Sequence, residues 1–397
     1  MVTRRHNPQV WRNAVFAVFL INGLGFSTWL ARVPAIRDGL DLATSEVAAL
    51  LFTGAMGAVS GLVFSSHVIA WIGQRNTIVF FGLLGLVGLT GIGWSSEIFS
   101  SYTLTVFAII AAGAGNGIAD VAMNVEGAKV ERALSRNVMP WFHAFWSLGT
   151  VSGAGMAALA SFFGIGLAVH ATTIAILAAI ALIGLARFLS TEASLPEGEQ
   201  QTASTLAERL GVWKEPRTIA IGLIALGMAF AEGSANDWLA IAMVDGREVT
   251  NATGALWFGF FTAGMMAGRI SGVWVLDRFG RVPVLQFSAG IAVAGLAIVI
   301  LVATPVISAI GAIMWGIGSS LGFPVAMSAA ADDPQRSAAR VSAVATVAYG
   351  AFLLGPPLIG GIGAQTGLLP ALWVVVAMIL LSFLSSPAAK TRETSAV

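Results

Sequence analysis

The sequence predicts an all-α membrane protein whose twelve transmembrane helices form two pseudo-symmetric bundles of six. Composition and a repeat between the two halves of the chain predict this fold class. Of 397 residues, 57% are hydrophobic and only 10% are charged, and the mean hydropathy is +0.84. Soluble domains carry about 25% charged residues. This chain has too few polar side chains to cover a surface in water, so lipid is expected to be its main solvent.

Composition also argues against several other classes of protein. The net charge is only +1, and no basic tract suggests a nucleic-acid partner. Cysteine is absent, which excludes disulfides and thiolate metal sites. No phosphate-binding loop, metal-ligand cluster or nucleophile–base set is present. We therefore expect no enzymatic activity, no cofactor and no metal.

Twelve apolar stretches are long enough to cross a bilayer, which takes about 20 residues. A polar stretch rich in Glu, Gln, Ser and Thr separates the sixth from the seventh. We thus expect an N-terminal bundle over 1–189, a cytoplasmic linker over 190–216 and a C-terminal bundle over 217–397. The first stretch is too long for a signal peptide, so it is expected to stay as a helix. The expected spans are 11–31, 46–70, 77–95, 102–126, 139–163, 166–188, 217–243, 252–276, 282–303, 306–330, 338–362 and 368–386.

Basic residues predict the orientation of these spans. Arg32, Arg37 and Arg247 fall in loops on one side of the membrane, and Arg269 falls within a span. The other 17 of the 21 basic residues lie on the opposite side. Because Lys and Arg gather on the cytoplasmic side, we expect both termini to be cytoplasmic in a bacterial inner membrane. Arg269 is expected to reach the cytoplasmic surface with its long side chain.

The two halves of the chain repeat each other. Small residues about 207 positions apart match in the same order along the chain, which is the pattern of a six-helix unit repeated in one topology. The matching residues are Ala48, Gly57, Gly61 and Gly73 in the first half and Ala255, Gly264, Gly268 and Gly280 in the second.

The segment 268–281 resembles the signature loop of the major facilitator superfamily, a Gly followed by Asp-Arg-x-Gly-Arg between the second and third helices of a half. Its charged residues are Asp277, Arg278 and Arg281. An Asp at a helix end binds an Arg or the N-terminus of a neighbouring helix. The resemblance therefore implies a cytoplasmic latch at Asp277 and a substrate site between the halves near the bilayer midplane. Positive-inside topology alone is the simpler explanation of these charges.

The first half carries only part of this signature. Gly73 and Arg75 are retained, whereas Ala70 stands in place of the Asp and Gln74 in place of the Arg. We therefore expect a weaker latch there, with Arg75 as its remaining basic residue. Glu126, near the cytoplasmic end of the fourth span, is a further candidate for a latch or a structural ion pair.

A second resemblance covers the fourth and fifth spans. Residues 117–124 and 139–149 resemble segments of the fucose and hexose:proton symporters and of their uncharacterised bacterial inner-membrane relatives. This implies a proton-coupled carrier. One family feature is missing, because the chain has no acid in the stretch 28–32, where the fucose permease carries one.

Ionisable residues at membrane depth are expensive and are functional candidates by default. Asp120 has Asn116 and Asn124 one turn to either side, which makes a polar stripe on one helix face. Because a carboxylate there is poorly solvated, we expect it to bind and release the coupled proton. Glu232, in the seventh span, is the second candidate for proton coupling. For each, a purely structural hydrogen-bond role is the alternative.

The remaining candidates for substrate contact are polar or aromatic residues within spans. An aromatic face packs well against the C–H face of a sugar, and His143 stands where the resemblance places a polar side chain. Packing inside a bundle is the alternative for each of them. The set consists of His143, Trp146, Asn236, Asp237, Trp257 and Trp315, together with Asn116 and Asn124.

These observations favour a monomeric secondary transporter whose partners are the lipid bilayer, a small-molecule substrate and protons. The first hypothesis is proton symport of a small polar solute, a sugar or a related compound. Proton-antiport efflux of drugs or metabolites is the alternative, since the same acids would serve it. A sensor that keeps the fold but does not transport is the third hypothesis.

Overall fold

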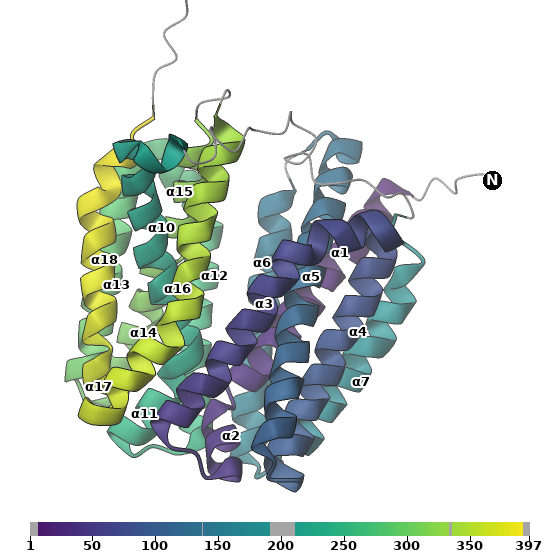
Figure 1. Cartoon of the computed structure of the whole chain (residues 1–397), viewed down its shortest axis with the longest axis vertical. Helices are drawn as coiled ribbons and strands as arrows, with labels where there is room; N and C mark the ends of the chain where they lie inside the picture. Colours follow the sequence, from purple (N-terminus) through teal and green to yellow (C-terminus); the bar gives the residue numbers. More distant parts are fainter. Residues whose placement is uncertain (1–6, 137, 191–210, 333–335, 392–397) are drawn as a thin grey trace, which may run out of the picture. The chain divides into compact units, whose positions relative to one another are not determined.

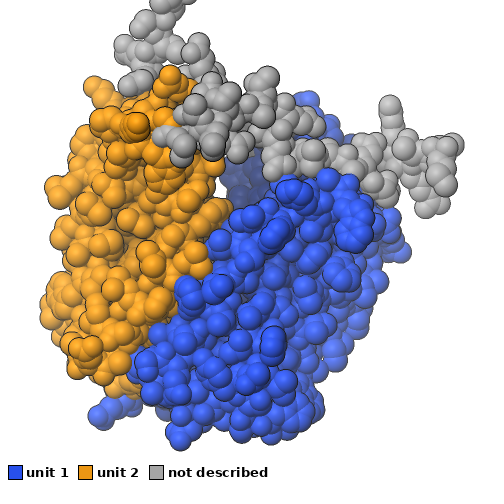
Figure 2. Space-filling model, in the orientation of Figure 1, with its two compact units in different colours: residues 1–196, 248–259 blue, residues 197–247, 260–397 orange. Residues whose placement is uncertain are grey.

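The computed structural model is helical, and no β-strand occurs among the residues that it describes (Figure 1). Those residues are 7–136, 138–190, 211–332 and 336–391. Of the expected linker over 190–216, residues 191–210 lie outside the described part. The chain divides into two compact units, unit 1 with residues 1–196 and 248–259, and unit 2 with residues 197–247 and 260–397 (Figure 2). The bundle boundaries 1–189 and 217–397 stay a prediction.

Unit 1 is built around α5, against which α3 and α4 pack along their lengths, while α1 packs along α6. Its helices are α1 (Pro8–Leu30), α2 (Val33–Leu40), α3 (Thr44–Ile72), α4 (Gln74–Gly93), the π-helix η1 (Trp94–Ile98), α5 (Tyr102–Leu134), α6 (Met139–Phe162) and α7 (Leu167–Ala186).

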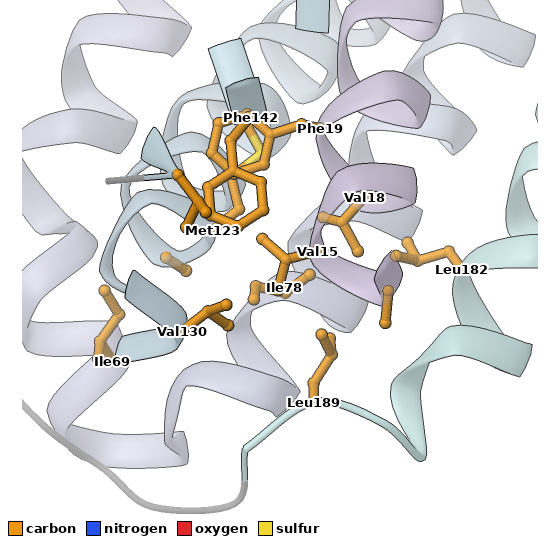
Figure 3. Close-up of a cluster of buried hydrophobic side chains, with 13 residues drawn as sticks. Val15, Val18, Phe19, Ile69, Ile78, Met123, Val130, Phe142, Leu182 and Leu189 are labelled. Atoms are coloured by element: carbon orange, nitrogen blue, oxygen red, sulfur yellow. The ribbon is translucent and has the colours of Figure 1, made fainter. Parts of the chain in front are cut away.

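A cluster of buried apolar side chains holds one end of unit 1 together (Figure 3). Phe19 of α1 and Phe142 of α6 stack with their ring centroids 5.4 Å apart, and Met123 of α5 lies beside them. Leu182 of α7 and Ile78 of α4 extend the cluster to two more helices. Ile69 of α3 belongs to the cluster as well, so close packing of these side chains holds the ends of six helices together.

Unit 2 is centred on α10, which packs against α16 and α18, while α13 packs against α14. Its elements are η2 (Val212–Lys214), α10 (Pro216–Ser234), the π-helix η3 (Ala235–Leu239), α11 (Ala240–Arg247), α12 (Asn251–Phe279), α13 (Arg281–Leu301), α14 (Pro305–Ser319), α15 (Gly322–Ala330), α16 (Ser337–Thr366), α17 (Leu368–Ala371), α18 (Trp373–Ser385) and η4 (Ser386–Ala389). The first turns of α12 belong to unit 1.

Ten helical segments in the described part of the chain are long and apolar enough to cross a membrane. Two more helices, α6 with 24 residues and α12 with 29, have sufficient length. The all-α membrane fold is confirmed, and the count of twelve spans stays a prediction that depends on these two helices. One expected boundary was wrong, since α5 continues to Leu134 instead of ending near 126. The expected boundary was placed where the apolar stretch ends, whereas the helix continues beyond it through polar residues.

The glycines retained in both copies of the signature loop have a backbone reason. Gly73 links α3 to α4 with φ 77° and ψ 160°, and Gly280 links α12 to α13 with φ 75° and ψ 172°. This region of backbone conformation is accessible essentially only to glycine. The turn geometry therefore requires Gly73 even in the half that has lost the charged part of the motif.

Helices α1 and α6 approach each other closely because glycines face the opposite backbone. A Cβ on Gly23 would overlap the backbone oxygen of Trp146, and a Cβ on Gly149 would overlap that of Leu20. A Cβ on Gly153 would overlap the side-chain hydroxyl of Ser27 and the backbone oxygen of Leu24. This contact brings polar side chains of α1 within hydrogen-bonding distance of α6.

Candidate functional site

The polar stripe predicted on α5 is present. Asn116, Asp120 and Asn124 are all half-buried. The Asn124 amide donates to the backbone oxygen of Asp120 at 2.9 Å, and not to its carboxylate. Within the described residues, the Asp120 carboxylate has neither an ion pair nor a hydrogen bond. Asp120 thus places an acid in the middle of a helix that packs against α3 and α4.

Glu232 of α10 forms an ion pair with Arg269 of α12, with 3.1 Å between Oε1 and Nη2. The two side chains are only 17% and 21% exposed, respectively. The expectation that Arg269 reaches the cytoplasmic surface was wrong. An acid at membrane depth needs a counter-charge, and the long guanidinium side chain supplies it. The sequence did contain an indication of this pair, because one acidic and one basic residue lie inside expected spans of the same half.

Three residues after Glu232, the helix widens into the π-helix η3, which sequence analysis did not predict. Two candidates for substrate contact, Asn236 and Asp237, lie on it and are half-buried. The Asp237 carboxylate has no hydrogen-bond or ion-pair partner among the described residues, and the indole nitrogen of buried Trp238 has none either. Such wide turns inside helices are frequent at functional sites. This turn places Asn236 and Asp237 about one turn beyond Glu232.

Two other candidates lie between α1 and α6. The indole nitrogen of Trp146 donates to Oδ1 of Asn22 at 3.0 Å, and the Trp146 ring lies 5.7 Å from the ring of Phe26. His143 is exposed and meets the ring of Phe19 edge-on at 5.5 Å. Sequence analysis missed Asn22, because a single Asn in a long apolar stretch gives no indication of its partner.

Trp257 and Trp315 are both buried. Trp257 is 4% exposed and Trp315 is fully buried. The Trp315 ring packs against Phe261 with 5.3 Å between the ring centroids. Both residues pack as core residues in this structure, and their contact with a substrate stays a prediction.

The signature loop does not form the expected latch in this structure. Asp277 is exposed and has no ion-pair or hydrogen-bond partner in the described part of the chain. Arg281 instead pairs with Asp332 at 2.7 Å, and Arg217 pairs with the same carboxylate at 2.8 Å. Asp332 follows α15, so its approach to α10 and α13 depends on the tertiary fold. The latch role of Asp277 stays a prediction.

The other predicted gate residues have different surroundings. The Arg278 guanidinium lies over the ring of Phe279, 5.7 Å from its centroid. Arg75 is half-buried without a hydrogen-bond partner among the described residues. Glu126 is buried and accepts from the indole nitrogen of Trp11 at 2.8 Å and the backbone nitrogen of Ser190 at 2.5 Å. These contacts indicate that Glu126 anchors the end of α7 to α1.

A second charge cluster joins the start of α10 to α16. Glu215 accepts from Arg340 at 2.7 Å, from Arg336 at 2.9 Å and from the hydroxyl of Thr218 at 2.9 Å. The hydrogen bond from Arg340 is the main cause that lowers the pKa of Glu215 from 4.5 to about 2. Arg340 is 13% exposed and Arg336 59%, so Arg340 is the more firmly held partner.

Replacing Glu215 with Gln is expected to lower the melting temperature of the purified protein at pH 7. Because the folded-state pKa is depressed, Glu215 contributes stability above about pH 4.5 and loses it as the pH falls towards about 2. The contribution is about 1 kcal/mol, since solvent screens the pair. Melting curves of wild type and E215Q from pH 7 to pH 3 test this.

The difference between the two proteins should shrink on acidification, and a constant difference would contradict the assignment. The two arginines provide a matched comparison within the same cluster. Arg340→Ala should lower the melting temperature more than Arg336→Ala, because Arg340 supplies the main hydrogen bond and is less exposed.

Within the described residues, no three His, Asp or Glu side chains lie close enough together to hold a metal ion. The chemistry available here is that of unpaired and paired carboxylates, amides and aromatic faces at membrane depth.

These features, several apolar spans with acids at mid-helix, define a polytopic membrane carrier. A sequence model of the Major Facilitator Superfamily matches residues 138–352. The chain belongs to this superfamily and is therefore a transporter and not an enzyme.

Several relatives match over most of their length. An uncharacterized transporter, y4wD, of Sinorhizobium fredii is 30% identical over 88% of this chain and 90% of its own. An uncharacterized transporter of the same superfamily from Yersinia pestis is 27% identical over 94% of both chains. The membrane protein MosC of Rhizobium meliloti is 26% identical over 92% of this chain and 86% of its own.

Solved structures with the same fold share little sequence with this chain. A mutant of the nucleoside transporter NupG aligns with a TM-score of 0.77 and 12% identity, over 96% of this chain and 99% of its own. FucP in its outward conformation aligns with a TM-score of 0.65 and 13% identity, over 96% of this chain and 99% of its own. The D-xylose-proton symporter aligns with a TM-score of 0.71 and 13% identity, over 97% of this chain and 99% of its own. At these identities the likeness shows the fold alone.

Proposed function

We propose that this chain is a secondary active transporter that carries a small polar solute, a sugar or a related compound, together with protons by alternating access. The observation that carries this proposal is the Asp120 carboxylate, which is half-buried in the middle of α5 and unpartnered in the described part of the chain. Charge away from water is costly. A proton would neutralise Asp120 without breaking any hydrogen bond or ion pair described here.

Glu232 is the weaker of the two predicted proton sites. Its carboxylate is joined to Arg269 at 3.1 Å, so a proton there has to replace an existing ion pair. We assign proton coupling to Asp120 first. In this proposal the Glu232–Arg269 pair holds α10 to α12 beside Asn236 and Asp237.

The substrate class is supported by the chemistry of the structural neighbours. NupG is a nucleoside transporter, FucP a fucose:proton symporter and the third neighbour a D-xylose-proton symporter. All three solutes carry a hydroxylated ring. Such a ring offers hydroxyl groups to amide and carboxylate side chains and a C–H face to an indole.

The proposed setting is a monomer in the bacterial inner membrane with both termini cytoplasmic. Its support is the 17 basic residues on one side of the predicted spans against three on the other. The proposed arrangement retains two bundles, 1–189 and 217–397, joined by 190–216. Asp277 and the Arg281–Asp332 pair would lie at the cytoplasmic ends of their helices.

The sign of proton movement tests the proposed function. Purified protein is reconstituted into liposomes that contain a pH-sensitive dye, with no pH gradient imposed. L-fucose, D-xylose or uridine is then added outside. For a symporter, downhill entry of the solute carries protons inwards, so the interior is expected to acidify.

Alkalinisation of the interior by any of these solutes would instead identify antiport, the efflux alternative. Uptake without any pH change would contradict proton coupling. Liposomes without protein and liposomes treated with a protonophore are the controls, because both should show no solute-dependent change in pH.

A further inference from the structure

Asn22 of α1 and Trp146 of α6 are joined across the closest approach of their helices. The indole N–H of Trp146 donates to Asn22 Oδ1 at 3.0 Å. An indole nitrogen is only a donor, so the amide oxygen must face the indole. Gly23, the next residue of α1, leaves room for the Trp146 backbone. The pair is therefore fixed by backbone packing as well as by its hydrogen bond.

The opposite end of the same amide carries the NH₂ group, Nδ2. Within the described residues, nothing accepts a hydrogen bond from Nδ2 of Asn22, and the side chain is half-buried. An amide NH₂ group carries two donor hydrogens. A partly buried amide with unused donors pays a desolvation penalty that a hydroxyl or carbonyl oxygen of a ligand would remove.

Next to these donors is an indole face with a fixed orientation. The Trp146 ring is half-buried, with its edge bound to Asn22 and the Phe26 ring 5.7 Å away at an angle of 39°. His143 lies one turn before Trp146 on the same side of α6 and is exposed. The surface thus combines one oriented π-face with polar donors at its edge.

We infer that Asn22 and Trp146 form one recognition element for a hydroxylated ring. The Trp146 face packs against the C–H face of the ring, and Asn22 Nδ2 donates to one of its oxygen atoms while Oδ1 holds the indole in place. Asn22 is therefore both a contact and the positioning residue for Trp146. This inference rests on the proposed function, because it names the residues that would bind the proposed substrate class.

Equilibrium binding to the full-length protein in detergent, with no gradient, tests the element. Binding of L-fucose, D-xylose and uridine is measured by calorimetry for wild type, Asn22→Ala, Trp146→Phe and the double variant. Asn22→Ala should lower the affinity for the best probe, the one that wild type binds most tightly, by about tenfold, which is the effect of losing one hydrogen-bonded contact. Trp146→Phe retains a π-face but loses the bond to Asn22, so the two effects should be less than additive.

Analogues of the best probe that each lack one hydroxyl group separate contact from structure. For wild type, one of the deoxy analogues should bind more weakly than its parent. For Asn22→Ala that analogue and the parent should bind equally, because the contact with the hydroxyl is already absent. A residue with only a structural role would not remove the discrimination between the two ligands.

Trp94 provides the matched control, since its indole nitrogen donates to the hydroxyl of Thr172 at 2.9 Å elsewhere in unit 1. Trp94→Phe should leave binding unchanged. If Asn22→Ala weakens binding no more than Trp94→Phe, or if no probe binds wild type, the element is refuted. Binding that depends on Asn22, combined with no solute-driven proton movement, would contradict the proposed symport and leave this element standing.

Discussion

Asp120→Asn is expected to abolish proton-driven accumulation of the transported solute while leaving exchange of solute across the membrane partly intact. Asparagine keeps the shape and polarity of the neutral acid, but it cannot release a proton. If protonated and ionised Asp120 favour different arrangements of the carrier, the variant is held in one of them. With one proton per solute, each pH unit of gradient supports about tenfold accumulation. For the variant the ratio of inside to outside concentration should fall to about one, as for passive equilibration.

The measurement is uptake into proteoliposomes under an imposed pH gradient, paired with counterflow in the absence of a gradient. Glu126→Gln is the matched control, because Glu126 lies on the same helix but its carboxylate is bound to Trp11 and Ser190. That variant should lose thermal stability and retain accumulation. Accumulation by Asp120→Asn equal to wild type would show that Asp120 is structural, and Glu232 would then be the next candidate.

Removing Arg269 is expected to have the second large effect. Arg269→Ala leaves the Glu232 carboxylate, which is 17% exposed, without its guanidinium partner. Losing one member of a buried pair costs about 3–5 kcal/mol, and partial exposure reduces this to about 2–3 kcal/mol. The melting temperature should fall by several degrees, and transport should be lost with it because α10 and α12 lose a fixed contact.

The double variant Glu232→Gln/Arg269→Ala should regain part of the lost stability, because no uncompensated charge remains. Arg278→Ala, at the exposed end of the same helix, should change the free energy of unfolding by less than about 0.5 kcal/mol and so leave the melting temperature nearly unchanged. If Arg269→Ala alone is as stable as wild type, the ion pair contributes nothing to the fold.

Features that depend on local composition could be predicted from the sequence. Lipid as solvent follows from the low charge content, and most helix positions follow from apolar stretches, because each transmembrane helix satisfies its backbone hydrogen bonds internally. The superfamily was identified from the segment 268–281, where Gly280 is required by the backbone conformation of the turn. Such properties reside in single segments, so no knowledge of the partner helix is needed.

The site could be predicted only in part, because the partners of each side chain lie far away in the sequence. Asp120 was recognisable as an acid in an apolar stretch. Only the packing of α5 showed that its carboxylate has no ion-pair or hydrogen-bond partner in the part of the chain that the structure describes. Asn22 and Trp146 are separated by 124 positions, and nothing in either segment indicates their contact. The contacts of the signature loop were unpredictable for the same reason, since Arg281 is bound by Asp332, a residue outside the motif.

The sequence by itself therefore determined a multi-spanning helical transporter of the Major Facilitator Superfamily, its charge asymmetry and the acids at membrane depth. Tertiary structure alone decided that Glu232 is paired with Arg269, that Asp120 has no partner among the described residues, and that Trp315 is buried in the interior of unit 2. The physical reason is that hydrophobicity and helix formation act along the chain, residue by residue. Ion pairing, hydrogen bonding and burial of a side chain depend on which helix faces it.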